Sequence, residues 1–355
     1  MAENTIIEKL IADSEYRNAL NLPSEITEVY TLLAQGEYNV NYLFAHPETG
    51  RKLVLRVNMG SQMHLDRQIE YEAHALSILR KSGRTPEVYY VDDSMRNLNH
   101  GILVMNYLPG RYPVYVNTGD MGAVMECMAD IHSVEIPFEE VIYGEPFGDE
   151  RVPADTVKLI APQSSASSIL DECELMAATY MDSDFSDKTV KRRLRLLLDK
   201  GHELAGNLTD NTEFRRCCIN TELNSTNFLV DDEGFARLVD WEKPLYGDPA
   251  QDLGHLLAPT TTFWKTDNVF STDETERLID VYLEAVGKRF DTAGIRERTK
   301  ALINITCLRG LTWCAMAWVE YQNPDKLIAN ESTRKKLDDY LSDSFLRDIE
   351  TRLSL

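Results

Sequence analysis

Residues 218–242 read CINTELNSTNFLVDDEGFARLVDWE. Two apolar runs, Phe228–Val230 and Phe235–Val239, flank a polar turn that ends on Gly234. Short apolar strands on either side of a turn closed by glycine are typical of a β-hairpin. The sequence therefore predicts a hairpin at this point, within a half of the chain whose other segments are mostly helical in pattern.

Polar side chains stand at both ends of this hairpin. Glu222 and Asn227 precede it, and Asp240 follows it directly. Because the two ends of a hairpin meet, we expect these three side chains to converge. Phosphoryl transfer needs a carboxylate that faces the attacking hydroxyl, and an Asn and an Asp that hold Mg²⁺ against the nucleotide phosphates. Taken singly, Asn227 could cap a loop and Asp240 could form a turn, but their joint spacing favours the site.

The remaining pattern divides the chain into two lobes. The segment before residue 108 alternates like a small antiparallel sheet with one main helix, and from Met121 onward the chain is mostly helical, apart from the hairpin and an irregular stretch at 152–168. The expected elements of the first lobe are a helix at 4–20, strands at 26–33, 38–45 and 52–58, a helix from Ser61 to Lys81 closed by Gly83, and strands at 88–91 and 102–107. The prediction is an α+β protein with an N-terminal lobe at 1–108 and a helical lobe at 109–355.

The segment around the hairpin resembles a known family. An acid, four residues, an Asn, a hairpin, then Asp240-Trp241-Glu242 and the run 247–253 (GDPAQDL) look like the aminoglycoside phosphotransferase and choline kinase-like superfamily. The resemblance implies a protein kinase-like two-lobed fold and transfer of phosphate from ATP, with Mg²⁺, to a hydroxyl of a small molecule. It also implies that Glu222 is the catalytic base, that Asn227 and Asp240 bind the metal, and that Asp252 braces the catalytic loop.

The resemblance extends into the first lobe. The turn from Gly36 to Asn41 looks like the family's nucleotide-covering turn, which assigns Gly36, Tyr38 and Asn39 to the nucleotide. The strand at 52–58 resembles the one that carries the phosphate-binding cation, here Arg56. Glu72 falls on the apolar stripe of the following helix, where a carboxylate needs a partner, and Arg56 is the candidate.

The strand at 102–107 continues into a segment that resembles the family's hinge. Asn106, Tyr107 and Leu108 would there present the backbone that pairs with the adenine edge. In all, the resemblance covers residues 26–257, and its most specific part is the catalytic segment.

One departure from the family leaves a second function open. The loop begins Asn220-Thr221-Glu222, where the family has His-Gly-Asp, so the base is one methylene longer. Near-attack geometry is sensitive to displacements of about 1 Å. The alternative is a nucleotide-binding pseudokinase, which holds ATP to regulate or to bind a partner and transfers nothing.

The charge composition of the chain bears on which classes of partner it can bind. Lys and Arg total 37 against 58 Asp and Glu, and a net charge of −21 repels nucleic acids and anionic membranes. The same charge would suit a cationic substrate, although acidic surfaces also simply keep proteins soluble. The start of the chain carries Glu3 and Glu8 where a signal peptide needs basic residues, and no apolar run is long enough to span a bilayer, so we expect a cytoplasmic protein.

The cysteines and a group of acids allow two further expectations. The six cysteines show no metal-ligand spacing, and we expect reduced, mostly buried thiols. Asp171, Glu172 and Glu174 fall near the start of an expected helix from about Ser168. They would either wall the acceptor pocket or complement the helix dipole, and the dipole is the simpler interpretation.

Overall fold

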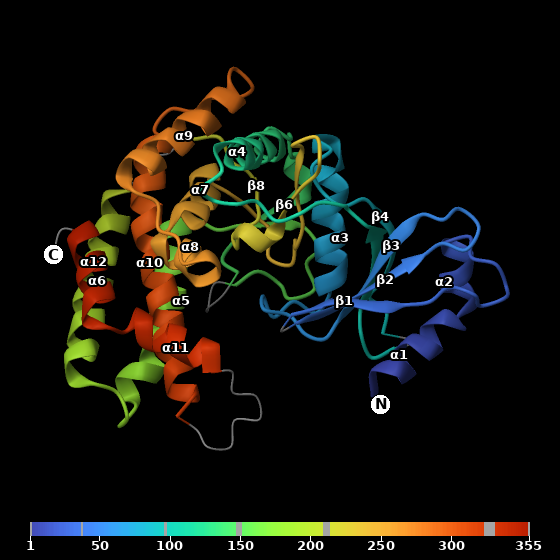
Figure 1. Cartoon of the computed structure of the whole chain (residues 1–355), viewed down its shortest axis with the longest axis horizontal. Coiled ribbons are helices and arrows are strands. Elements are labelled where there is room, and N and C mark those ends of the chain that lie inside the picture. Colours follow the sequence, from blue (N-terminus) through green and yellow to red (C-terminus); the bar gives the residue numbers. More distant parts are fainter. Residues whose placement is uncertain are drawn as a thin grey trace. The chain divides into compact units, whose positions relative to one another are not determined.

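The computed structural model describes residues 2–36, 38–95, 98–146, 151–208, 214–322 and 331–353. Its internal contacts divide the chain into two compact units (Figure 1). Unit 1 comprises Met1–Ala161 with Asn227–Tyr246, and unit 2 comprises Pro162–Thr226 with Gly247–Leu355. The lobe boundary after Leu108 stays a prediction.

Unit 1 is built on a five-stranded sheet. Its strand order is β1-β2-β3-β5-β4, and each neighbouring pair is antiparallel. The strands are β1 (Thr31–Gln35), β2 (Asn39–Ala45), β3 (Lys52–Asn58), β4 (Val88–Asp92) and β5 (Ile102–Asn106). Central β3 pairs with β2 and β5 along its length, so its side chains are held in a fixed register.

The two faces of β3 differ, as strand alternation predicts. Leu53, Leu55 and Val57 belong to the core that the sheet shares with the N-terminal helices. Those helices contribute Leu10 and Tyr16 to it. Arg56 points to the opposite face because successive side chains of a strand alternate. The apolar face thus anchors the strand, and the other face is left for the polar residue.

Unit 1 contains further elements around this sheet. They are α1 (Ala2–Ile11), α2 (Ser14–Ala19), α3 (Gln68–Leu79), α4 (Thr118–His132), the 3₁₀ turns η1 (Arg80–Ser82) and η2 (Phe138–Glu140), the parallel pair β6 (Val141–Tyr143) and β7 (Leu159–Ala161), and the hairpin β9 (Phe228–Val230) and β10 (Ala236–Leu238). The hairpin that the sequence predicted is confirmed, with the second strand one residue shorter at each end.

The first predicted helix and strand need correction. The helix expected at 4–20 is split, because the Asp13 carboxylate accepts a hydrogen bond from Tyr16 N at 2.9 Å and starts a new helix. The strand expected at 26–33 begins only at Thr31. Glu28 is buried and pairs with Arg17 of α2 at 2.6 Å. This segment is therefore held against the helix and does not pair with the sheet.

The helix expected from Ser61 begins at Gln68 instead. His64 has φ 53°, in the left-handed region, which interrupts a helix. Ser61 accepts a hydrogen bond from Leu65 N at 2.9 Å and donates one to Gln68 Oε1 at 2.5 Å, so it caps a turn that precedes the helix. The helix ends at Leu79, before the predicted Lys81, and a 3₁₀ turn follows it. Gly83 at φ 69° closes that turn, as predicted.

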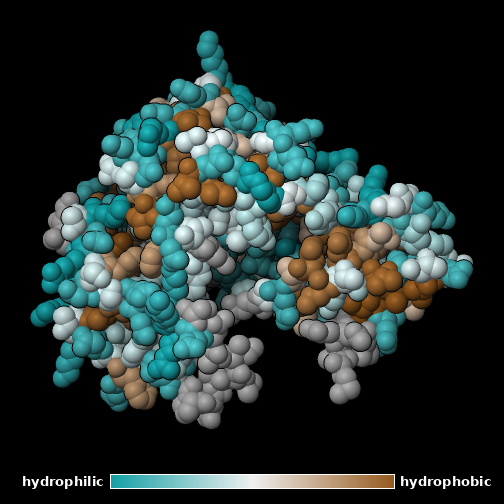
Figure 2. All heavy atoms as spheres, in the orientation of Figure 1, coloured by the Kyte–Doolittle hydropathy of each residue, from teal (hydrophilic) through white to brown (hydrophobic). Residues whose placement is uncertain are grey.

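The edge strand β1 is open to solvent. All five of its residues are exposed, and Leu32 keeps 58% of its surface. Figure 2 shows apolar surface gathered over this part of unit 1, where Figure 1 draws β1 and β2. Apolar side chains on this strand therefore do not belong to the core of the unit.

Unit 2 is mostly helical and is organised around one long helix. Helix α10 (Ile295–Glu320) contacts α5, α6, α7, α8, α11 and α12. The other elements are α5 (Ser165–Asp182), α6 (Lys188–Asn207), β8 (Cys217–Ile219), α7 (Pro249–Leu257), α8 (Pro259–Thr266), α9 (Thr272–Val286), α11 (Glu331–Tyr340) and α12 (Asp343–Arg352); η3 (Ser225–Asn227) and β11 (Leu245–Gly247) lie where the chain passes between the units. By length and composition α10 could cross a membrane, but 61% of its most apolar window is buried in the protein, as in a core helix.

All six cysteines are buried free thiols, as the sequence predicted. Burial raises the pKa of each thiol, to about 12 for Cys127 and Cys173, so these side chains are protonated and act as small apolar residues.

Candidate active site

The cation on β3 pairs with a carboxylate on α3 and with the acid after the hairpin. Arg56 Nη1 lies 2.6 Å from Glu72 Oε1, and Arg56 Nη2 lies 3.2 Å from Asp240 Oδ1. The predicted pair of Arg56 and Glu72 is therefore confirmed. Burial alone lowers the pKa of Arg56, but Glu72, Asp240 and Glu242 outweigh it and raise that pKa, so the guanidinium stays charged.

Asn227 and Asp240 lie at the same end of the hairpin. Phe228 pairs with Leu238 in the ladder, and Val239 N donates a hydrogen bond to Asn227 O at 2.8 Å. Asp240 has φ 67°, and its side chain is 44% exposed, whereas Asn227 is buried. The hairpin thus places the backbone of Asn227 beside that of Val239, one residue before Asp240, and the convergence of the two side chains on a metal stays a prediction.

The turn before β2 is tied to the segment after the hairpin. Gly36 N donates to Asn39 O at 2.9 Å, and the Asn39 side chain donates to Glu242 and accepts from Asn58 at 2.9 Å. The backbone oxygen of Tyr38 accepts from Met59 N at 2.7 Å. Sequence reasoning missed Glu242 as the partner of this turn. Glu37, in the middle of the predicted motif, lies outside the described residues.

The predicted hinge continues β5. Asn106 Oδ1 accepts from Glu87 N at 2.7 Å, while the backbone N–H groups of Asn106 and Tyr107 donate to Glu87 O at 3.0 Å and Lys52 O at 3.1 Å. Leu108 is buried. Two of the three hinge N–H groups are thus used within unit 1.

In unit 2, Asp252 braces the loop that carries Glu222. Its two carboxylate oxygens accept hydrogen bonds from Asn220 N and Thr221 N, each at 2.8 Å, and the residue is 1% exposed. Thr221 has φ 72°, a conformation that a β-branched residue rarely adopts. The brace that the resemblance implied is present in the structure.

Glu222 itself is held by an arginine that sequence reasoning missed. Arg309 of α10 donates from Nη2 to Glu222 Oε1 at 2.9 Å, and it also binds Glu172 of α5 through Nε at 2.8 Å and Nη2 at 3.0 Å. The signal was that Arg309 is the only charged residue between Ala301 and Val319 of this helix, because a largely buried cation needs a partner.

The acids at the start of α5 have roles that differ from the predicted one. Helix α5 begins at Ser165, so Asp171, Glu172 and Glu174 lie beyond its first turn, and the helix-dipole interpretation is wrong for them. Glu172 binds Arg309, and Glu174 pairs with Arg195 at 2.7 Å.

His255 of α7 supports the same loop. Its Nδ1 lies 2.8 Å from Leu223 O. Burial, and then the charge of Arg309, lower the pKa of His255 to about 4, so the ring is neutral at pH 7 and Nδ1–H donates to the carbonyl. The role of His255 is therefore structural.

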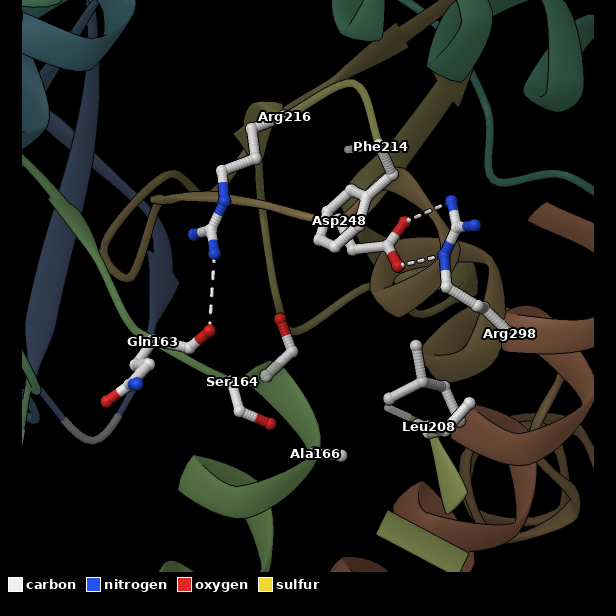
Figure 3. A pocket seen from close by; sticks show the side chains of 10 residues that line it. Gln163, Ser164, Ala166, Leu208, Phe214, Arg216, Asp248 and Arg298 are labelled. Carbon is white, nitrogen blue, oxygen red and sulfur yellow. Dashed lines mark hydrogen bonds and ion pairs between the residues drawn. The ribbon is translucent and has the colours of Figure 1, made fainter. Parts of the chain in front are cut away.

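A small pocket of unit 2, of about 40 Å³, lies beside the start of α5 (Figure 3). Its two arginines are engaged: Arg298 binds Asp248, the N-cap of α7, and Arg216 donates to Pro162 O at 2.8 Å and to Gln163 O at 3.2 Å. This volume holds a few water molecules at most. The pocket therefore supports α7, which carries Asp252, and is too small for an acceptor.

Comparison with known proteins gives the family. The structure has an antiparallel sheet in its N-terminal part and a mostly helical C-terminal part, the arrangement of a protein kinase-like two-lobed fold. The sequence model of the phosphotransferase enzyme family matches residues 29–298, and the chain belongs to this family of small-molecule kinases. No curated protein matches the chain.

Solved structures with the same fold bind different acceptors. A spectinomycin phosphotransferase, in complex with ADP and spectinomycin, has TM-score 0.60 at 10% identity and covers 93% of each chain. An ethanolamine kinase from Plasmodium vivax has TM-score 0.61 at 14% identity, over 94% of this chain and 88% of the other. A choline kinase from Streptococcus pneumoniae has TM-score 0.58 at 16% identity, over 98% and 99%. At these identities the likeness establishes the fold.

Proposed function

We propose that this protein transfers the γ-phosphoryl group of ATP, with Mg²⁺, to a hydroxyl of a small molecule in the cytoplasm. The observation that carries the proposal is the set Arg56, Glu72 and Asp240, joined by ion pairs of 2.6 and 3.2 Å and completed by Asn227 at the end of the hairpin. A buried, permanently charged guanidinium beside oxygen ligands suits nucleotide phosphates and their metal.

The metal ligands fit Mg²⁺. Asn227 and Asp240 offer an amide oxygen and a carboxylate, which are hard oxygen donors. Among the residues that the structure describes, no three His, Cys, Asp or Glu side chains gather into a metal cluster. Mg²⁺ is commonly held by one or two carboxylates together with substrate phosphates, so this small donor set is compatible with it. When bound, Mg²⁺ would neutralise charge on the transferring phosphoryl group.

The nucleotide would lie against the sheet of unit 1. We assign the adenine edge to the hinge, with the N–H of Leu108 as donor, because those of Asn106 and Tyr107 donate to Glu87 and Lys52. Gly36, Tyr38 and Asn39 would cover the phosphates, and Arg56 would steady them while Glu72 fixes its position.

Glu222 would act as the base. Only four residues separate it from Asn227 along the chain, and Asp252 fixes the backbone just before it. In this proposal its carboxylate orients the acceptor hydroxyl and accepts its proton as the oxygen attacks the γ-phosphorus, while the bond from that phosphorus to the bridging oxygen breaks and ADP leaves.

The acceptor is the open part of the proposal. Solved relatives act on spectinomycin, ethanolamine and choline, all of which are small molecules, and two of which are amino alcohols or quaternary amines. The net charge of −21 favours a cationic acceptor at long range. ADP release with a panel of aminoglycosides, choline, amino alcohols and sugars would identify the class.

The substitution Asp240→Asn tests the metal assignment. It removes the carboxylate from the metal and from Arg56, and we expect kcat to fall by roughly 100-fold or more, because metal neutralisation supplies several kcal/mol to the transition state. The measurement is ADP release with the best acceptor of the panel. Asp232→Asn, in the exposed turn of the same hairpin, is the matched control and should keep full activity.

Retention of wild-type activity by Asp240→Asn would show that the metal assignment is wrong. The ion pair of Glu222 with Arg309 favours one alternative, a pseudokinase whose base is occupied. For that function, the wild-type protein would bind ATP in a calorimetric titration and release no ADP with any acceptor.

A further inference from the structure

Arg309 joins the candidate base to a second helix of unit 2. Its guanidinium lies between Glu172 and Glu222, with side chains that are 20%, 22% and 25% exposed, respectively. The Nε and Nη2 atoms form a forked pair with both oxygens of Glu172, and the same Nη2 reaches Glu222 Oε1. Helix α5 therefore anchors the arginine, and the arginine in turn anchors the loop carboxylate.

The backbone under Arg309 is also fixed. The next residue, Gly310, lies so close to α8 that a Cβ there would be 2.6 Å from the Cβ of Thr260. Helix α10 cannot shift at this point without separating from α8. The carboxylates of Glu172 and Glu222 raise the pKa of Arg309 against the effect of burial, so its charge is permanent.

We propose that Arg309 is a positioning residue for Glu222: it holds this longer carboxylate in the one orientation from which it can meet an acceptor hydroxyl. The inference rests on the proposed function. A glutamate has one more rotatable bond than the aspartate that the loop pattern would otherwise place here, and so it samples more positions. A charge-assisted hydrogen bond to Oε1 removes that freedom and fixes the carboxylate in one orientation.

This role predicts a specific split of the kinetic constants. Arg309→Met releases Glu222, and we expect kcat to fall about 100-fold, the effect of a displacement of about 1 Å at a reacting group. The KM for ATP should stay within about twofold of wild type, because the nucleotide residues belong to unit 1. Arg309→Lys keeps the charge but loses the forked pair of hydrogen bonds. Its kcat should therefore lie between those of the wild type and Arg309→Met, about tenfold below wild type.

A matched control lies on the same helix. Arg296 also binds two acids, Glu276 at 2.7 Å and Asp280, both of α9. Within the described part of the chain, its ion pairs include no residue of the catalytic loop. Arg296→Met removes an equivalent pair of ionic contacts from α10 and should leave kcat within about twofold of wild type.

A double-mutant cycle separates positioning from general support. In Glu222→Asp the shorter side chain loses its reach to Arg309, so adding Arg309→Met should change kcat by less than about threefold. An equal loss of about 100-fold in both backgrounds would show that Arg309 acts independently of Glu222, and would overturn the proposal. Should Arg309→Met fail to fold, because two carboxylates lose their partner, Arg309→Lys takes its place in the cycle.

Crystal structures of the same variants give a readout that needs no turnover. In Arg309→Lys or Arg309→Met, we expect Glu222 to leave its wild-type rotamer or to lose ordered density while Asp252 keeps its hydrogen bonds to the loop. An unchanged, ordered Glu222 overturns the positioning role. If instead the wild-type protein releases no ADP with any acceptor, the proposed function fails, whatever the position of Glu222.

Discussion

Asp252 is the residue on which the shape of the catalytic loop depends. It accepts two hydrogen bonds of 2.8 Å from Asn220 N and Thr221 N, and it is almost fully buried. The left-handed backbone of Thr221 costs about 1–2 kcal/mol for a residue with a Cβ, and these bonds help to offset it. A carboxylate is needed because both of its oxygens accept.

We therefore expect Asp252→Asn to destabilise the protein by about 2–3 kcal/mol, since one N–H of the new amide faces a backbone N–H. Urea unfolding of the purified protein measures this change. Asp199→Asn removes a carboxylate that is 61% exposed on α6 and should cost less than about 0.5 kcal/mol. Equal losses in the two variants would contradict the assigned role of Asp252.

Residue by residue, the sequence was most informative where one side chain violated a local pattern. Glu72 on an apolar stripe called for a cation, and Arg56 supplies it. Arg309 in the apolar stretch of its helix is a violation of the same kind, but it was missed, and its partners lie 87 and 137 residues away in sequence. No local pattern identifies partners at such separations, so this part of the candidate site required the fold. The contact of Asn39 with Glu242 is long-range in the same way.

Among the elements, α10 depends on close approach to its neighbours. Gly310 faces α8, where a Cβ would lie 2.6 Å from Thr260 Cβ and 2.7 Å from its Oγ1. Thr260 is β-branched and buried, so it cannot rotate away without cost. Contact at this glycine therefore sets the spacing of the two helices.

Gly310→Ala should then destabilise the protein by about 1–3 kcal/mol, the usual effect of overpacking. The matched control is Gly206→Ala near the end of α6, where no atom lies within 4 Å of the added Cβ. That change should be neutral or stabilise by up to about 1 kcal/mol, because alanine favours a helix over glycine. Thermal unfolding of both variants checks the sign. A Gly310→Ala protein as stable as wild type would mean that α8 and α10 can move apart freely.

The type of each element followed from the sequence better than its start did. Strand β3 was predicted to the residue, because its apolar alternation is long and both neighbours pair with it. The start of α3 was misplaced by seven residues, since the left-handed His64 interrupts a segment whose composition favours helix. The spacing of apolar residues does not show that a non-glycine residue such as His64 has a left-handed backbone. Side-chain hydrogen bonds such as that of Ser61 determine where this helix begins.

For the molecule as a whole, the charge balance governs the response to acid. The net charge is −21 at pH 7 and the isoelectric point is about 4.8, so acidification from pH 7.5 relieves repulsion among carboxylates and on that account favours the folded state. His255 acts in the opposite direction. Its folded-state pKa of about 4 lies below its ordinary value of 6.5.

At pH 7.5 this histidine is neutral in both the folded and the unfolded chain. As pH falls through 6.5 toward 4, the unfolded chain binds a proton that the folded protein does not, so the folded state loses stability. Between pH 7.5 and 5.5 the loss from His255 should be about 1 kcal/mol. Urea unfolding at these two pH values measures it in the wild-type protein and in His255→Asn, whose side-chain amide can still donate to Leu223 O. The wild type should lose about 1 kcal/mol more than the variant over this range. Identical pH dependence in both proteins would contradict the lowered pKa of His255, because it would mean that the ring binds its proton as readily in the folded as in the unfolded chain.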